Sequence, residues 1–303
     1  MKLSELIRNI LSLHMIRSVY HIFISHYSDR DCYQAFVDDM NADSSKMGLM
    51  SSYWVNASGL RDRDIEAYTT AHDIAKMGIY AYMQGSINQF WNAREYICTI
   101  QKPYIFSIFS KKKKHKKITS TIPFNQIGDR YKILGAKTGT GDGYNGLMCV
   151  CDIGNGKIVS GAILDATSED VRFNAMHELM DIAYNIINKI SEDNKVVRNA
   201  KMACAYVLDS NGLEECIFKQ NADIKYPPMS LTKVLAFMTM SKYITYYHEW
   251  ITVIPFDEKK NDLIKKWSKL QISSLIYLSL LPSCCTASDT LARHCGNIIL
   301  NKL

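Results

Sequence analysis

The sequence lacks a long, uninterrupted hydrophobic run. Its apolar start is broken by Arg8, His14 and Arg17, so it falls short of the ~20 apolar residues that a transmembrane helix needs. No small-residue cleavage site follows, and we expect no signal peptide. The apolar residues have helical spacing, and residues 1–28 are predicted to form an amphipathic N-terminal extension. We expect it to pack on the domain; the less favoured alternative is contact with a membrane surface through residues 1–25.

The nine cysteines lack the spacing of a metal site or a disulfide framework. Their number is odd, and neither Cys149-Val-Cys151 nor Cys284-Cys285 is a CxxC pair of the zinc type. On a strand, Cys149 and Cys151 would point to one face, which predicts small apolar core residues. We therefore expect no metal ion, and this cysteine usage fits a reducing compartment better than an oxidising one.

Basic residues interleaved with aromatic ones, as nucleic-acid binding requires, are also missing. The net charge is +6, and much of it comes from one block, KKKKHKK at residues 111–117. Such a block predicts a solvated loop rather than a nucleic-acid partner. The chain has 303 residues, 47% of them hydrophobic, which is enough for one large domain or two smaller ones.

What is present is a series of amphipathic helices and strand hairpins. Helical spacing of apolar residues predicts helices at residues 29–48, 69–85, 168–190, 230–247 and 273–282. Alternation predicts a strand at residues 96–109, and glycine-containing turns predict hairpins at residues 146–166 and 202–223. We expect the two hairpins to share one antiparallel sheet packed by helices, which makes the fold class α+β.

Polar residues mark where several of these helices begin or end. Thr69 or Thr70 is expected to cap the helix at 69–85, and Ser168 the helix at 168–190. Gly48 is expected to end the helix that starts near residue 29.

The stretch YPPMSLTKVLAFM, residues 226–238, places Ser230 and Lys233 three apart at the head of an apolar helix. Positions i and i+3 share a helix face, and free N–H groups at the helix start favour a developing oxyanion. A lysine with a lowered pKa can take the serine proton. The spacing alone is weak, because Ser110 and Lys113 share it inside the lysine block, where we interpret it as accidental.

A second motif strengthens the case. Lys137, Thr138, Gly139 and Thr140 lie on a predicted strand next to further glycines. A strand edge can pair with an extended peptide, the ammonium and the hydroxyls can hold a terminal carboxylate, and the glycine permits close approach.

With these motifs in place, most of the chain from about residue 31 resembles the D-alanyl-D-alanine carboxypeptidases, which are penicillin-binding proteins with a serine β-lactamase-like fold. Residues 205–238 resemble the family's first hairpin and nucleophile helix, and residues 271–296 its Ser-x-Asn block. Residues 34–60 resemble its MN…GL…VN-x-x-GL segment, and residues 134–185 its final strands and C-terminal helix.

The blocks stand in a different order from the family's. In the family the nucleophile block comes first; here it follows the lysine-threonine-glycine block, as in a circular permutation. Residues 29–303 would then be one transpeptidase-like domain, with the family's C-terminal part at 29–190, a connector at 191–201 and its N-terminal part at 202–303. The new ends would fall in a turn after Gly296. The alternative is a homodimer that completes its fold by swapping.

The resemblance implies a role for each motif residue. Ser230 would attack a carbonyl, Lys233 would take its proton, and Ser283 would relay a proton to the leaving group. Lys137 would lower the pKa of the other amine and, with Thr138 and Thr140, orient the substrate carboxylate. The backbone N–H groups of Ser230 and Thr140 would form the oxyanion hole. No cofactor is implied.

Three further side chains need a separate interpretation. Cys285 stands where the family pattern has asparagine, so an amide that can both donate and accept hydrogen bonds is lost. Arg172 either attracts the substrate carboxylate or is a surface arginine of its helix. His72 and His177 are expected in the core or on the surface rather than in catalysis.

These features favour a serine-type D-Ala-D-Ala carboxypeptidase that acts on peptidoglycan stem peptides and is acylated by β-lactams. One alternative is a relative that uses the same acylation with another amide or ester as substrate. A β-lactamase is less favoured, because no deacylating glutamate can be assigned. The other is a catalytically silent relative that binds a peptide or a partner, which Cys285 favours. The family implies the cell envelope, whereas the missing export signal and the cysteines favour the cytoplasm.

Overall fold

The computed structural model of the chain describes residues 27–61, 65–102, 113–124, 130–141, 143–190 and 196–302. The predicted N-terminal extension lies outside the described residues, apart from its last two positions, and so do residues 191–195 of the predicted connector at 191–201. Within these ranges, no helix is both long and apolar enough to cross a membrane.

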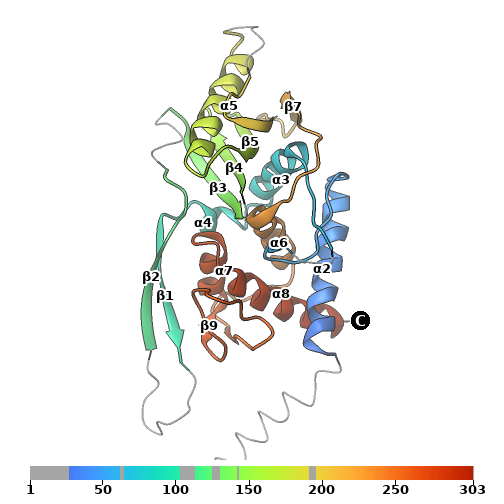
Figure 1. The fold of residues 1–303 in the computed structure, drawn as a ribbon, viewed down its shortest axis with the longest axis vertical. Coiled ribbons are helices and arrows are strands. Elements are labelled where there is room, and N and C mark those ends of the chain that lie inside the picture. Colours follow the sequence, from blue (N-terminus) through green and yellow to red (C-terminus); the bar gives the residue numbers. More distant parts are fainter. Residues whose placement is uncertain are drawn as a thin grey trace, which may run out of the picture.

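The upper half of the molecule is built on a five-stranded antiparallel sheet (Figure 1). Its order is β3-β4-β5-β6-β7, formed by Lys132–Gly141, Tyr144–Asp152, Ile158–Ala166, Ala200–Leu208 and Glu214–Gln220. The hairpins β4–β5 and β6–β7 turn at Asn155 and Gly212, where positive φ angles reverse the chain. The prediction of two hairpins in one antiparallel sheet is confirmed, and with it the α+β fold class.

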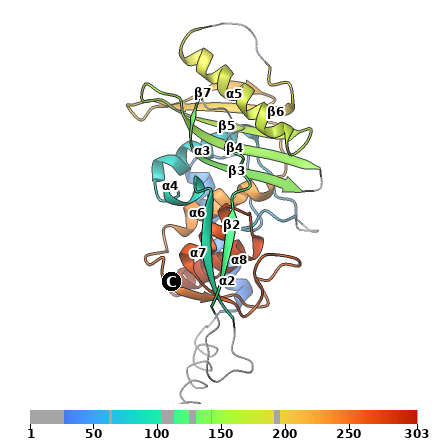
Figure 2. The same cartoon turned by 90° about the vertical axis from the view of Figure 1, so that its left-hand side faces the viewer.

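Helices cover both faces of this sheet and divide the apolar core in two. Helix α5 (Val171–Ile187) packs on one face and α3 (Ala71–Gln84) on the other (Figure 2). Cys149 and Cys151 of β4 are fully buried in the core beneath α5, with their sulfur atoms 3.5 Å apart and unbonded. Their predicted role as small core residues is confirmed.

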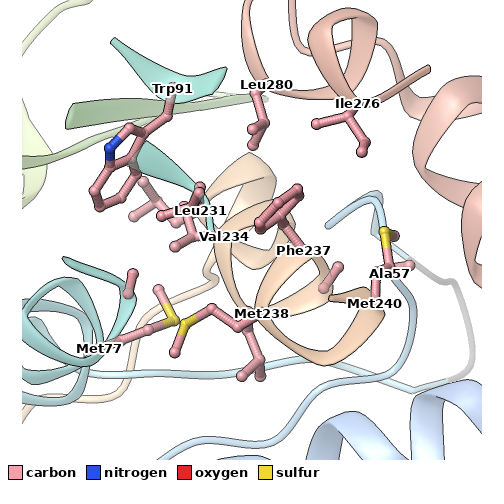
Figure 3. Close-up of a cluster of buried hydrophobic side chains, with 14 of the residues drawn as sticks. Ala57, Met77, Trp91, Leu231, Val234, Phe237, Met238, Met240, Ile276 and Leu280 are labelled. Carbon is pink, nitrogen blue, oxygen red and sulfur yellow. The ribbon is translucent and has the colours of Figure 1, made fainter. Parts of the chain in front are cut away.

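The lower half is helical and forms around α6 (Thr232–Met240). All nine residues of α6 are buried, Lys233 among them, and most of the others are apolar. Figure 3 shows Val234 and Phe237 of α6 pointing at Trp91, Ile276 and Leu280 from neighbouring elements. Around it lie α2, α4, α7 and α8, formed by Asp29–Lys46, Asn88–Trp91, Ile272–Leu280 and Cys285–Leu300.

The polar residues at helix ends mostly act as the sequence predicts. Helix α2 ends next to Gly48, which has a φ of 70°. Thr70, not Thr69, caps α3, because its side chain accepts from the Asp73 N–H at 3.1 Å. Helix α5 begins at Val171, three residues later than predicted, and Ser168 Oγ accepts from the Val171 N–H at 3.3 Å.

Two predicted boundaries differ from the structure: one of a helix and one of a turn. The predicted helix at 230–247 begins with a 3₁₀ turn, η1 (Met229–Leu231), and ends at Met240, because Ser241 to Tyr243 continue it only as turns. The turn expected after Gly296 is absent from the described chain, because α8 continues to Leu300.

The lysine block was predicted to be a loop, and this is wrong for Lys113–Lys117. These residues lie in β2 (Lys113–Thr119), which pairs along its whole length with β1 (Glu95–Gln101). The pair belongs to a second sheet of order β2-β1-β9-β8, with β8 at Trp250–Thr252 and β9 at Lys269–Gln271. Backbone pairing stabilises the strand while most of its lysine side chains remain exposed, and lysines on an edge strand deter pairing with other chains.

Candidate active site

A cleft of about 700 Å³ opens where β3, the edge strand of the five-stranded sheet, meets η1 and the turn before α8. Residues from distant parts of the sequence line it. They include Gly59, Thr138, Thr140, Arg172, Ser230, Ser283 and Cys285. The motifs predicted from the sequence therefore meet in one concave site.

Ser230 and Lys233 form the centre of this cleft. Ser230 lies in η1 and is partly exposed, whereas Lys233, one turn later in α6, is 1% exposed. Lys233 Nζ lies 2.8 Å from Ser230 Oγ and also contacts the Ser58 carbonyl oxygen and Cys285 Sγ. The amine is thus held against the hydroxyl from which it would take a proton.

The backbone before Ser230 is held in an unusual conformation. Met229 has a φ of 48°, which is uncommon for a residue with a side chain. Its carbonyl oxygen accepts from Thr232 Oγ1 at 2.8 Å, and that oxygen would lie 1.7 Å from a Cβ added at Gly59. Gly59 therefore permits a close approach that aims Ser230 into the cleft.

Lys137 and Ser283 form a second amine–hydroxyl pair. Lys137, on β3, is 1% exposed, and its Nζ donates to Ser283 Oγ at 2.9 Å and to the Thr138 carbonyl oxygen at 3.0 Å. Ser283 has a φ of 64° in the turn before α8. Burial lowers the pKa of Lys137 well below its usual value, and the nearby charge of Lys233 lowers it further.

The three residues after Lys137 shape the wall of the cleft. Thr138 Oγ1 lies 3.0 Å from Thr121 Oγ1. A Cβ at Gly139 would lie 3.1 Å from Leu231 Cγ, so glycine lets β3 pack closely on η1. Thr140 is exposed at the mouth of the cleft.

The family model described as D-alanyl-D-alanine carboxypeptidase matches residues 30–167, a little under half of the chain. This match supports the resemblance to that family. No curated protein and no solved structure matches the chain.

The match relates residues 30–167 to a family of serine peptidases, which are hydrolases. The matched range includes Lys137 through Thr140 but ends before Ser230, Lys233 and Ser283. The carboxypeptidase resemblance of those three therefore rests on their motifs and on the contacts described above.

Arg172 is not the surface arginine that one interpretation expected. It is 3% exposed, and its guanidinium donates to Thr140 Oγ1 and, at 3.4 Å, to the Gly139 carbonyl oxygen. It also forms an ion pair with Glu169 at 3.5 Å. Among the described residues its Nε has no hydrogen-bond partner, so one N–H beside the cleft is left unsatisfied.

Cys285 departs from the carboxypeptidase pattern, as the sequence indicates. It is the first residue of α8, and its Sγ lies 3.4 Å from Lys233 Nζ and 3.8 Å from the Ser283 carbonyl oxygen. A thiol thus occupies the place where an amide would face the substrate.

Sequence reasoning missed the loop that supports Lys233. Asn56 Oδ1 accepts from the Gly59 N–H at 2.6 Å, and its side chain donates to the Leu60 carbonyl oxygen at 2.7 Å. This asparagine therefore fixes the turn that presents the Ser58 carbonyl oxygen to Lys233. The VNASGL segment, which resembles the family's VN-x-x-GL, was the sequence signal that could have indicated this loop. The backbone oxygen itself has no sequence signature.

The two histidines lie outside the described cleft lining. His72 Nε2 lies 2.7 Å from the phenolic oxygen of Tyr206, and His177 is partly exposed on α5. Of the accidental pair, Lys113 lies on β2 and Ser110 lies outside the described residues. No group of three or more potential metal ligands occurs in the described ranges.

Proposed function

We propose that the chain is a serine-type D-Ala-D-Ala carboxypeptidase that acts on peptidoglycan-type peptides through an acyl-enzyme. One observation carries this proposal: Lys233 Nζ lies 2.8 Å from Ser230 Oγ in a cleft that a second pair, Lys137 and Ser283, also faces. A nucleophile in contact with its base is the signature of covalent catalysis.

In the proposed reaction, Ser230 Oγ attacks the carbonyl carbon of the scissile peptide bond while Lys233 Nζ takes its proton. The backbone N–H groups of Ser230 and Thr140 stabilise the oxyanion. When the C–N bond breaks, Ser283 relays to the leaving amine the proton that Lys233 took from Ser230. Water then hydrolyses the ester and frees Ser230.

The edge position of β3 supports binding of an extended peptide. Its outer backbone groups border the cleft, and an extended substrate can add to such an edge as a further strand. Arg172 supplies positive charge at this wall, where the terminal carboxylate would lie, and Lys137 supplies a further hydrogen-bond donor.

The pair of buried amines also bears on which of them is uncharged. The resemblance implies that Lys137 lowers the pKa of the other amine. In the structure, burial and the nearby Lys233 charge lower the pKa of Lys137 itself. A neutral Lys137 removes the repulsion between the two amines, so Lys233 can hold the proton that it takes from Ser230 until Ser283 relays it to the leaving amine.

Intact-protein mass spectrometry with benzylpenicillin tests the proposal. We expect one covalent adduct on the wild type and none on Ser230→Ala, which must give the wild-type circular dichroism spectrum. Release of D-alanine from a D-Ala-D-Ala peptide by the wild type alone would then identify the reaction. A folded wild type that forms no adduct would contradict the proposal.

A second candidate function is binding of a peptide without turnover, and Cys285 favours it. The thiol cannot offer both a donor and an acceptor to a substrate amide as asparagine does. Cys285→Asn separates the two candidates: a silent relative that lost only this amide gains penicillin acylation, whereas a working enzyme already shows it as wild type.

We also propose that one chain completes the site in permuted order. The single chain brings β3, η1 and the turn before α8 together without a second subunit. A swapped homodimer is the alternative, and the experiment that separates the two is given in the Discussion.

A further inference from the structure

Cys285 is the cysteine that faces the cleft. All nine cysteines lie in the described ranges, and all are free. Seven are buried, and the two partly exposed ones are Cys216 and Cys285. Of these, Cys285 belongs to the described cleft lining, whereas Cys216 lies on β7 beside Cys204.

Cys285 belongs to a cluster of nucleophilic and basic groups rather than standing alone. Lys233 Nζ contacts two nucleophiles, Ser230 Oγ at 2.8 Å and Cys285 Sγ at 3.4 Å. A thiol beside a basic amine can give up its proton to it, and the thiolate is the reactive form. The start of the 16-residue helix α8 adds a positive end that favours a negative charge on its first residue.

A second observation concerns the wall of the same cleft, which holds a buried donor without a partner. Arg172, 3% exposed, lines the cleft, and its buried Nε has no hydrogen-bond partner among the described residues. A buried donor left unsatisfied is costly.

We propose that Cys285 is a thiol modification site that takes small disulfides, and that its modification closes the serine site. Lys233 takes the thiol proton, and the thiolate attacks one sulfur of the disulfide. A new S–S bond forms at Cys285 as the old one breaks, and the leaving thiolate takes the proton from Lys233. An added thiol reverses the step, and no net oxidation occurs beyond the disulfide consumed.

Modification of Cys285 would block the serine site for two reasons: Cys285 and Ser230 share the Lys233 amine, and the space in the cleft is limited. A group attached to Cys285 Sγ lies in the cleft beside Ser230, and it withdraws Sγ from its contact with Lys233. This second half of the proposal rests on the proposed function, because it is read as loss of Ser230 acylation. The modification itself does not, because it is read as a mass increase at Cys285.

The test uses the full-length protein and 2-hydroxyethyl disulfide, a small neutral probe. Mass spectrometry with peptide mapping follows adduct formation on the wild type, on Cys285→Ser and on Cys216→Ser. We expect one adduct on the wild type, located at Cys285, absent from Cys285→Ser and retained in Cys216→Ser. Cys285 should react at least tenfold faster than Cys216.

Lys233→Met separates activation from mere exposure. We expect thiolation of Cys285 to slow at least tenfold in this variant, provided that it gives the wild-type circular dichroism spectrum. A purely exposed cysteine would react equally fast in both proteins, and that result would overturn the proposed role of Lys233.

Other outcomes decide the remaining parts. Three outcomes would contradict Cys285 as the modification site. The first is modification of Cys216 before Cys285, and the second is an internal Cys204–Cys216 disulfide with Cys285 unmodified. The third is no adduct on a folded protein that labels fully in urea. If Cys285 is modified and penicillin acylation is unchanged, the proposal that this modification closes the serine site is wrong. If Cys285 is modified and the unmodified wild type is never acylated, the proposed function fails while the thiol site stands.

Discussion

At the scale of single residues, the cleft is defined by two buried amines that are each paired with a hydroxyl. Lys137 and Lys233 are both 1% exposed, and each lies within 3 Å of a serine oxygen. Burying two amines together is unfavourable when both are charged, so the protein retains them at a cost in stability. That cost predicts a measurable dependence on pH.

We expect the free energy of unfolding to rise with pH above neutrality because of Lys137. Burial and Lys233 lower its pKa in the folded state, so the unfolded chain binds more protons between that lowered pKa and the usual 10.5. Stability therefore increases with pH through this window, and below it the full penalty applies. Urea unfolding between pH 7 and 9.5 should show a flatter dependence in Lys137→Met than in the wild type.

The control for this prediction is Lys132→Met, on the same strand. Lys132 is exposed, so water solvates its ammonium in both states. A wild-type pH dependence unchanged by Lys137→Met, or lost equally in Lys132→Met, would contradict the assignment to Lys137.

At the scale of elements, the site depends on β3, η1 and the loop around Gly59 approaching one another closely. Gly59 and Gly139 both lie where a side chain would meet neighbouring backbone. Such contacts fix η1 and thereby Ser230, so a change in the loop at residues 56–60 should reach the nucleophile without touching it.

We expect Gly59→Ala to lower the free energy of unfolding and to abolish penicillin acylation. Its Cβ would lie 1.7 Å from the Met229 carbonyl oxygen, so η1 must move. Gly85→Ala is a matched control, because Gly85 has a φ of 76° against 75° at Gly59 but nothing within 4 Å of an added Cβ. Both share the strain of a positive φ, and overpacking should cost Gly59→Ala about 1–3 kcal/mol more.

Urea unfolding and mass spectrometry with benzylpenicillin measure the two effects. Equal losses of stability in the two variants, with acylation intact in Gly59→Ala, would show that η1 does not depend on this contact.

Local signals explain which elements could be predicted from the sequence. The hairpins are marked by turns such as Asn211-Gly212, and α3 by its cap, because these residues act on their immediate neighbours. The sheet β2-β1-β9-β8 was missed because, in the part of the chain that the structure describes, β1 and β9 are linked through Gln101 and Lys269, which lie far apart in the sequence. The lysines of β2 also made this strand hard to predict, because they suit an exposed strand as well as a loop.

For the site, side-chain motifs could be predicted and backbone groups could not. Ser230, Lys233, Lys137 and Ser283 carry recognisable chemistry, and the structure brings them together. The Ser58 carbonyl oxygen is common to every residue type, so only its position identifies it. The burial of Arg172 likewise depends on β3 and α5 meeting, which no local pattern reveals.

At the scale of the whole molecule, the last helix lies against the first described one. A Cβ at Gly296 of α8 would lie 1.6 Å from the Cys32 carbonyl oxygen of α2, and Arg293 pairs with Asp29 at 3.8 Å. In the family order these two helices would be consecutive. Their contact supports the proposed permutation, because a short link would suffice to join them.

We expect the site to form within one chain. Ser230→Ala and Lys137→Met chains, unfolded together in urea and refolded as a mixture, should remain without penicillin acylation. In a swapped dimer, each mixed pair would combine Lys137 from one chain with Ser230 from the other and regain one intact site. Recovery of acylation in the mixture would therefore contradict the single-chain site, and the wild type refolded in the same way is the control.

The packing of α2 against α8 also has a consequence for how the protein is made. Helix α2 is synthesised early, but its partner α8 begins only at Cys285. At about 5–20 residues per second, the ribosome needs on the order of ten seconds or more to pass from one to the other. During that time the apolar stripe of α2, with Phe36 and Met40, has no α8 to cover it. The stripe is therefore open to chaperones until α8 has been made, and the cleft, which Cys285 of α8 lines, can assemble only after that point.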